Sequence, residues 1–126
     1  MTEASSRVAT RGIEAMAAMR IAAGLVAWFS PRLTARLFGI NSGGSHYAWR
    51  LFGVRDVMLG AGTLRSSGAQ RRAFAIAGLA CDVADGAAGA MSLYRNDFTR
   101  STAGAPVLVP ALAVAFGAWA LRGNDR

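Results

Sequence analysis

Five charged residues lie within apolar stretches of this chain and are the ones best placed to do chemistry: Arg20, Arg55, Asp56, Asp82 and Asp85. Neighbouring carboxylates can share a proton or hold a metal ion, and a guanidinium can bind a carboxylate through two parallel hydrogen bonds. Each charge falls near the middle of a long apolar segment, so the segments would bring all five to a similar depth. The sequence therefore predicts one polar cluster inside an otherwise apolar protein.

The spacing of these charges indicates how they would pair. Asp82 and Asp85 are three residues apart and share one face of a helix. Arg55 and Asp56 are adjacent, so their side chains point about 100° apart and each is better placed for a partner on another helix. We expect Arg55 or Arg20 to reach Asp82 or Asp85 across helices.

Three interpretations of the cluster are open. A charge at the centre of a bilayer costs about 2.5–3.5 kcal/mol, so these residues should face the interior of the bundle and pair with one another. If Arg50 near one end is included, three arginines face three aspartates. The pairs could fix helix register, form a polar binding site or ion path, or support catalysis by Asp82 and Asp85. No catalytic signature surrounds them, and the single Cys81 and single His46 make no zinc set. We therefore predict no catalytic residue, no metal and no cofactor.

Small residues accompany each group of charges along the same helix face. Small side chains let helix backbones approach closely in a membrane, where packing and polar contacts replace the hydrophobic effect. The glycines predicted to pack helices in this way are Gly24, Gly53, Gly60, Gly78 and Gly89.

The elements that must position the cluster follow from composition. The chain has 126 residues, of which 53% are hydrophobic and 17% charged, below the average of about 25% for soluble proteins. One domain, 12–122, holds four apolar segments at 12–30, 46–64, 73–94 and 103–121, with polar tails at 1–11 and 123–126. Each segment is long enough to cross a bilayer. We expect an all-α, four-helix transmembrane bundle; a soluble four-helix bundle is disfavoured because 103–121 has no charged face.

A shorter segment at 31–40 follows the first apolar segment and has a different pattern. Arg32 and Arg36 are four residues apart, and Leu33 and Leu37 lie on the other side. This pattern predicts a short amphipathic element in the membrane interface, with a plain loop as the alternative.

The basic residues lie mostly at segment ends. All 14 are arginine, the net charge is +7, and no basic stripe typical of a nucleic-acid-binding protein is present. Arginines of the loops divide seven against four between the two sides, which predicts that both termini are cytoplasmic. The seven are Arg7, Arg11, Arg65, Arg71, Arg72, Arg122 and Arg126, and the four are Arg32, Arg36, Arg95 and Arg100.

One run of the sequence is similar to a known family. Residues 50–60, Arg-Leu-Phe-Gly-Val-Arg-Asp-Val-Met-Leu-Gly, preceded by Leu-Phe-Gly-Ile at 37–40, resemble an uncharacterised (domain of unknown function) family of small bacterial four-helix integral membrane proteins. The similarity would extend from about Ile13 to Leu121. It implies four spans in a bacterial inner membrane, with Gly53, Arg55, Asp56 and Gly60 at the family's shared centre, and it implies no activity or ligand.

These observations predict a small membrane protein that is not an enzyme. We expect it to bind a lipid, a polar small molecule or a partner membrane protein through the Arg/Asp cluster, and its partners would include membrane lipids and further copies of itself but no nucleic acid. The alternative is an oligomeric transporter or channel component with Asp82 and Asp85 in an ion or proton path.

Overall fold

A computed structural model of the chain describes residues 3–39, 46–96 and 104–124. Within these ranges the chain forms helices and no strands, which confirms the all-α prediction. The helices are α1 (Glu3–Phe29), α2 (Pro31–Leu37), α3 (Tyr47–Arg65), α4 (Gly68–Tyr94) and α5 (Ala105–Asn124).

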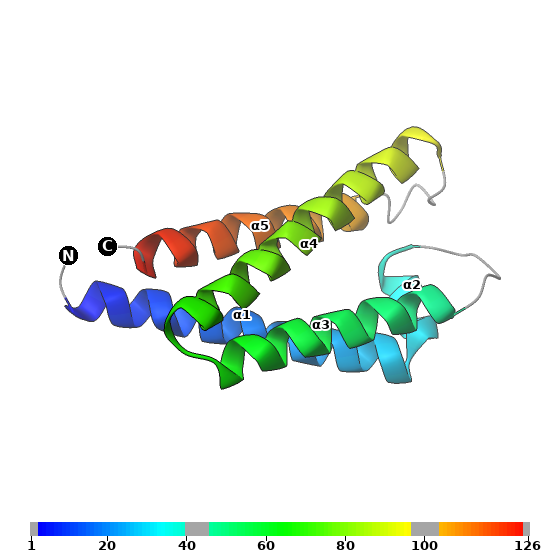
Figure 1. Cartoon of the computed structure of the whole chain (residues 1–126). Coiled ribbons are helices and arrows are strands. Elements are labelled where there is room, and N and C mark those ends of the chain that lie inside the picture. The colour runs from blue at the N-terminus through cyan, green and yellow to red at the C-terminus, as the bar shows by residue number, and fades with distance from the viewer. Residues whose placement is uncertain (1–2, 40–45, 97–103, 125–126) are drawn as a thin grey trace.

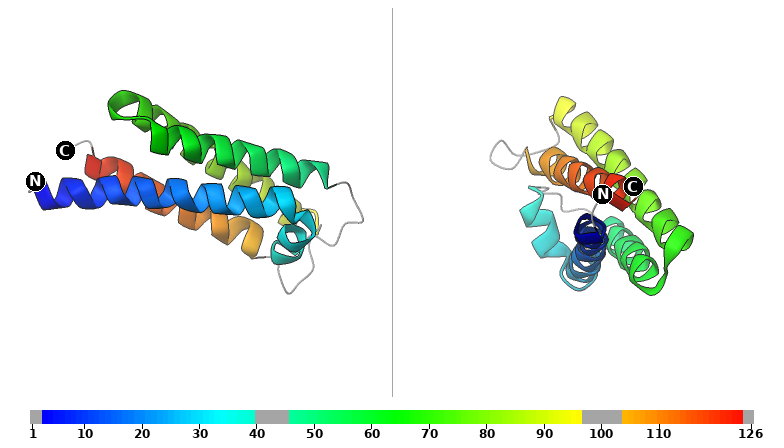
Figure 2. Two further views of the ribbon diagram at one scale, coloured as in Figure 1. Left: turned by 90° about the horizontal axis from the view of Figure 1, so that it is seen from below. Right: turned by 90° about the vertical axis from the view of Figure 1, so that its left-hand side faces the viewer.

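The four long helices run antiparallel to their neighbours in sequence and form two pairs, α1 with α3 and α4 with α5 (Figures 1 and 2). The start of α1 and the end of α5 lie at the same end of the molecule, and the short α2 lies at the other end beside the start of α3 (Figure 1). From their connecting turn toward the α2 end, α4 and α3 move apart. The two pairs therefore meet at the terminal end and separate toward the α2 end.

Glycines allow the α1–α3 pair to pack backbone against backbone. A Cβ added at Gly24 would lie 2.5 Å from the carbonyl oxygen of Gly53, and one added at Gly53 would lie 2.5 Å from the carbonyl oxygen of Gly24. Farther along, a Cβ at Gly60 would lie 2.6 Å from the carbonyl oxygen of Ala17. Any side chain at these positions would push the helices apart, which is the close approach that small residues permit in membranes. In the second pair, Gly89 of α4 faces the Pro106 carbonyl group of α5 in the same way.

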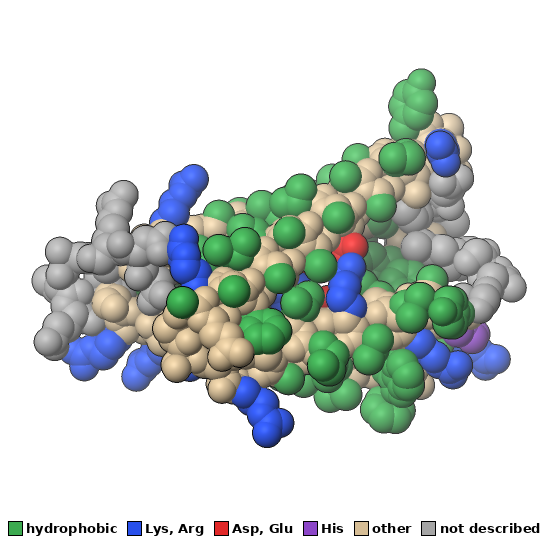
Figure 3. Space-filling view, viewed as in Figure 1, with side chains coloured by type: hydrophobic (Ala, Val, Ile, Leu, Met, Phe, Trp, Pro, Cys, Tyr) green, Lys and Arg blue, Asp and Glu red, His purple; other side chains and the backbone are tan. Residues whose placement is uncertain are grey.

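The buried side chains are mostly small or polar, and the large apolar ones face outward. The buried apolar residues are Ala9, Ile13, Ala17, Ala27, Ala120 and Leu121. Asp56 and Asp82 are also buried, whereas Met19, Phe29 and Leu112 are each at least two-thirds exposed. Apolar side chains cover much of the face seen in Figure 3. A water-soluble bundle buries its large apolar side chains, so this distribution suits an apolar surrounding.

Three helices contain segments long and apolar enough to cross a membrane: Ser6–Phe29, Gly68–Tyr94 and Ala105–Gly123. The fourth predicted span, α3, is not among them because Arg50, Arg55, Asp56 and Arg65 interrupt its apolar sequence. The structure thus supports a membrane protein with three apolar helices, and a bundle of four transmembrane helices remains a prediction.

Several helix boundaries differ from the sequence-based prediction. The first helix begins at Glu3, so residues 3–11 are helical and do not form the polar tail expected there. Tertiary packing explains the extension, because Ala9 lies against Gly123 near the end of α5. The predicted basic loop at 65–72 is also mostly helical, since α4 begins at Gly68 and not at residue 73. At its start the Arg71 Nε donates a hydrogen bond of 2.8 Å to the Ser66 carbonyl oxygen.

The segment at 31–40 forms a short helix and not a plain loop. Pro31 occupies the first turn of α2, where its missing N–H costs nothing. The helix ends at Leu37, and Gly39 follows with a φ of 71°, the left-handed conformation that commonly terminates helices. Ile40 lies outside the described residues. At the other end of the chain, α5 continues to Asn124, so two residues of the predicted C-terminal tail are helical.

Candidate functional site

The structure brings all five predicted charged residues into one network of ion pairs, here called the charge cluster. Arg20 comes from α1, Arg55 and Asp56 from α3, and Asp82 and Asp85 from α4. The sequence predicts that arginines of α1 and α3 contact aspartates of α4. Two such contacts are present, Arg20 with Asp82 and Arg55 with Asp85. The other described helices, α2 and α5, contribute no residue to these ion pairs.

Arg20 is the centre of the inner half of the cluster. Its Nη1 lies 3.4 Å from Asp56 Oδ1, and its Nη2 donates to Asp82 Oδ2. The side chains of Arg20, Asp56 and Asp82 are 11%, 7% and 10% exposed. One guanidinium therefore joins three helices in a nearly closed environment, where each charge depends on its partners.

Gly78 makes the space for the Arg20 guanidinium. A Cβ added at Gly78 would lie 2.9 Å from Arg20 Nε and 3.0 Å from Cζ. The sequence predicts Gly78 as a helix-packing glycine, and the structure places it against a charged side chain and not against another backbone. Its position four residues before Asp82, on the same helix face, is the sequence signal for this role.

Arg55 and Asp85 form the outer half of the cluster. Arg55 donates from Nη1 to Asp85 Oδ1 at 3.1 Å and from Nη2 to Oδ2 at 2.7 Å, a bidentate pair. The Arg55 Nε and Nη2 also lie 3.3 and 3.2 Å from Asp56 Oδ1, so these two adjacent residues are in contact. The shortest hydrogen bond of Arg55 is nevertheless the one to Asp85 on α4, as expected for adjacent residues whose side chains point in different directions. The side chains of Arg55 and Asp85 are 32% and 30% exposed. This half of the cluster is reachable from outside the bundle, between α3 and α4 (Figure 3).

Sequence reasoning missed the contribution of Phe52 to this outer half. The Arg55 Cζ lies 4.9 Å from the centroid of the Phe52 ring, a cation–π contact from one turn earlier in α3. The ring of Trp49 lies 6.2 Å from that of Phe52, and Phe38 lies 5.5 Å from Trp49. The three-residue spacing of 49, 52 and 55 was the available signal, because such residues are neighbours on a helix surface.

The expected balance of three arginines and three aspartates is wrong. Arg50 is exposed at the start of α3 and makes no ion pair with the cluster. Its position near the helix end, about five residues or 7.5 Å from Arg55, explains why it does not reach. Two guanidiniums therefore face three carboxylates, and the cluster carries an excess of negative charge when all five groups are ionised.

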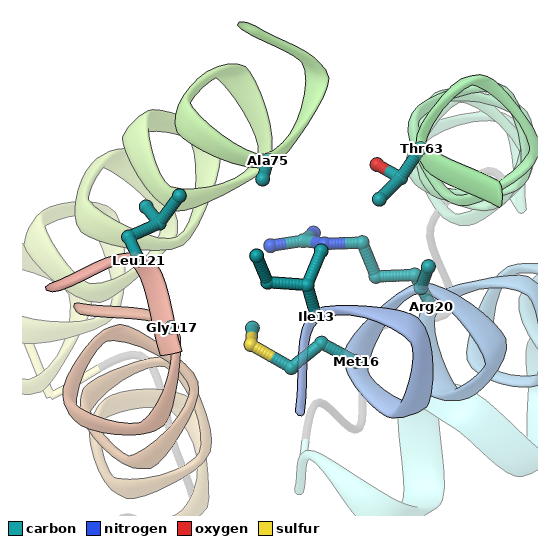
Figure 4. A pocket seen from close by; sticks show the side chains of 8 residues that line it. Ile13, Met16, Arg20, Thr63, Ala75, Gly117 and Leu121 are labelled. Carbon is teal, nitrogen blue, oxygen red and sulfur yellow. The ribbon is translucent and has the colours of Figure 1, made fainter. Parts of the chain in front are cut away.

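The inner half of the cluster has its hydrogen bonds satisfied and little free space. Among the described residues, no buried side-chain nitrogen or oxygen lacks a hydrogen-bond partner. A cavity of about 20 Å³ lies beside Arg20, which is room for about one water molecule (Figure 4). It is lined by Ile13, Met16, Ala17, Arg20, Thr63, Ala75, Gly117 and Leu121. This cavity is too small for a ligand larger than water.

No group of three or more His, Cys, Asp or Glu side chains that could hold a metal ion occurs in the part of the chain that the structure describes. Asp82 and Asp85 pair with different arginines, Arg20 and Arg55. Cys81 is a half-buried free thiol. Outside the cluster, Arg71 Nη1 and Glu14 Oε1 form an ion pair of 3.2 Å between α4 and α1 near the terminal end, which the sequence did not indicate.

No family model, no curated protein and no solved structure matches this chain. The resemblance of residues 37–40 and 50–60 to a family of small bacterial membrane proteins therefore stays a prediction. A proposal for function has to come from the geometry of the cluster and from the surface around it.

Proposed function

We propose that this protein is a small, non-enzymatic integral membrane protein that binds a polar group of a partner through Arg55 and Asp85. The partner is a small polar molecule, a lipid, or a membrane protein, including a second copy of this chain. The observation that carries the proposal is the difference in exposure within the charge cluster: about a third of each outer side chain is accessible, against about a tenth of each inner one.

Membrane insertion is the first part of the proposal. Three apolar helices, outward-facing apolar side chains and inward-facing charges support it. In this arrangement α3 is the fourth span, since Arg55 and Asp56 turn toward α1 and α4 while Arg50 and Arg65 lie at its ends. A bacterial inner membrane with both termini in the cytoplasm follows from the resemblance and from the arginine count of the loops.

The ligand's chemistry follows from the composition of the outer half. A carboxylate or phosphate would compete with Asp85 for the fork of Arg55, whereas a cation or hydrogen-bond donor would bind Asp85 directly. Since three carboxylates face two guanidiniums, a cationic or hydrogen-bond-donating group is the better match. Such a group buried in a bilayer would gain from a pre-formed partner at the same depth.

Native mass spectrometry of the protein in mild detergent tests the binding function. The wild type should carry a stoichiometric bound mass, or assemble into a defined oligomer, and Asp85→Asn should lose it while remaining folded. Asp82→Asn is the matched control on the same helix, and its main effect should be lower thermal stability. If the wild type is a bare monomer and both variants only lose stability, the cluster is a structural element and the proposal is wrong.

An ion or proton path is the second candidate, because carboxylates and guanidiniums alternate from the partly exposed Asp85 through Arg55 and Asp56 to the nearly buried Arg20 and Asp82. Reconstitution into vesicles containing a pH-sensitive dye tests this candidate. A proton flux that Asp85→Asn abolishes would favour transport, and the absence of flux with a retained ligand would favour binding alone.

A further inference from the structure

The surface of α2, at the end opposite the termini, exposes both basic and apolar side chains. The helix packs against the bundle through Pro31 and Thr34, which are buried. Arg32 and Arg36 are exposed one turn apart, and Leu33 and Leu37 are 46% and 62% exposed on the same short helix. These two leucines point outward and therefore do not pack against the core.

Within the described residues, the α2 end of the molecule carries exposed basic side chains. No Asp or Glu occurs in the sequence between Glu14 and Asp56, and of the five arginines in that stretch, Arg32, Arg36 and Arg50 lie outside the charge cluster. Arg50 at the start of α3 and Arg95 after α4 are also exposed. Basic side chains project from the α2 end in Figure 3. Within the described part of the chain, Arg32, Arg36 and Arg50 form no ion pair, so they are available to an external anion.

Aromatic contacts hold this surface in place. The ring of Phe38, directly after α2, lies 5.5 Å from the ring of Trp49 in α3. Phe29 and Tyr47 flank α2 and are 79% and 66% exposed. Exposed aromatic rings beside arginines are typical of the boundary between the acyl chains and the headgroups of a bilayer.

We infer that the α2 surface, formed by Arg32, Leu33, Arg36 and Leu37 together with Arg50, binds the headgroups of anionic phospholipids. The inference rests on the membrane insertion in the proposed function and adds a specific lipid site to it. Guanidiniums bind phosphate oxygens in bidentate geometry, and the two leucines have an apolar environment only if they enter the acyl region below the headgroups. A soluble polyanion would satisfy the arginines and leave the leucines in water, so an anionic membrane surface fits both sets of side chains.

The terminal end of the bundle provides the comparison. It is also basic, and Arg65 and Arg122 are exposed there. That end has an internal carboxylate, since Glu14 pairs with Arg71. The described part of the chain has no second short helix like α2 at that end. Arg65 and Arg122 therefore share the charge and exposure of Arg32 and Arg36, and Leu64 beside Arg65 is 40% exposed, but the two arginines lie on different long helices and not one turn apart on one short surface helix.

Titration with lipid, read by native mass spectrometry in detergent, tests the site. The wild type should retain phosphatidylglycerol more strongly than phosphatidylcholine. The double variant Arg32→Gln/Arg36→Gln should lower the affinity for phosphatidylglycerol about tenfold to thirtyfold, since each arginine near an anionic surface contributes a severalfold effect. Arg65→Gln/Arg122→Gln should change that affinity by about twofold or less. Arg32→Lys/Arg36→Lys should retain part of the affinity, because lysine keeps the charge but not the bidentate geometry of the guanidinium.

Three results would overturn the inference. These are equal retention of the two lipids by the wild type, equal losses in the two glutamine double variants, or equivalent binding of inorganic phosphate alone, which would indicate a free-anion site. The glutamine variants should keep the wild-type melting temperature, because all four arginines are exposed. Arg32→Gln/Arg36→Gln should keep the bound mass or oligomer that Asp85→Asn loses, so failure of the cluster as a binding site and failure of the lipid site are distinguishable.

Discussion

Arg20 and Arg55 each contact two aspartates, and in both cases one aspartate is Asp56 and the other lies on α4. Their surroundings differ. Arg20 contacts aspartates of α3 and α4 in a nearly closed environment and fits against Gly78, whereas Arg55 is about a third exposed and contacts the Phe52 ring. The same pair of chemical groups can therefore serve two purposes: the enclosed pair fixes the positions of three helices, and the open pair can exchange an internal partner for an external one.

The largest effect should come from removing the enclosed arginine. Arg20→Met leaves Asp56 and Asp82 buried without their shared cation, and we expect unfolding in detergent to become easier by about 3–5 kcal/mol. The matched variant Arg55→Met should cost less than Arg20→Met, because Arg55 and Asp85 are each about a third exposed and Asp56 keeps Arg20 as a partner. Thermal unfolding followed by circular dichroism measures both. Equal losses would remove the distinction between the two halves.

The next largest effect is expected at the close contact between α1 and α3, the helices that hold Arg20, Arg55 and Asp56. Gly24→Ala places a Cβ 2.5 Å from the Gly53 carbonyl oxygen, and the backbone cannot yield without moving α1 from α3. We expect a loss of about 1–3 kcal/mol. Gly86→Ala is the control, because its Cβ would meet Pro110 at an ordinary 3.5 Å and alanine favours helix, so it should be neutral or stabilising by up to about 1 kcal/mol. A tolerated Gly24→Ala would contradict the close approach of α1 and α3.

A smaller and more specific effect is expected at Gly78. Gly78→Ala should displace the Arg20 guanidinium and weaken its bond to Asp82, for a loss of about 1 kcal/mol. The loss should disappear when Gly78→Ala is made in the Arg20→Met background, because the displaced group is then absent. A double-mutant cycle with thermal unfolding measures this coupling. Additive losses would show that Gly78 acts through the backbone alone.

The smallest effect on stability should come from the outer carboxylate. Asp85→Asn keeps the shape of the side chain and leaves Arg55 in contact with Asp56, so we expect a loss of about 1 kcal/mol or less. The measurement is again thermal unfolding, now paired with the bound mass. A loss as large as that of Arg20→Met would place Asp85 with the structural half of the cluster.

The meeting of the five charges followed from the sequence because depth and helix spacing are local properties. Charges near the middle of apolar segments had to face inward, and the i,i+3 spacing of Asp82 and Asp85 placed both on one side of α4. The short amphipathic element after the first long helix was predicted on the same basis, and α2 forms there.

Other features depended on tertiary packing and were not predicted. Residues 3–11 look like a polar tail in isolation, but Ala9 packs against Gly123 of α5 and the segment is helical. The separation of α3 from α4, which divides the cluster into an enclosed and an open half, depends on how the two helix pairs meet and has no signature in either helix alone. The same holds for Gly78, whose neighbour is a side chain from a helix 58 residues earlier in the chain.

A charge exchange across the outer pair tests the central claim most directly. In the double variant Arg55→Asp/Asp85→Arg, the ion pair between α3 and α4 can re-form with its charges reversed. Asp56 loses its contact with Arg55, but Arg20 keeps both of its partners, Asp56 and Asp82. If the outer half is a binding site, native mass spectrometry should show a folded protein that has lost the bound mass or partner of the wild type. A reversed pair that retains the wild-type mass, or a wild type that carries none, would contradict the assignment of Arg55 and Asp85 to binding.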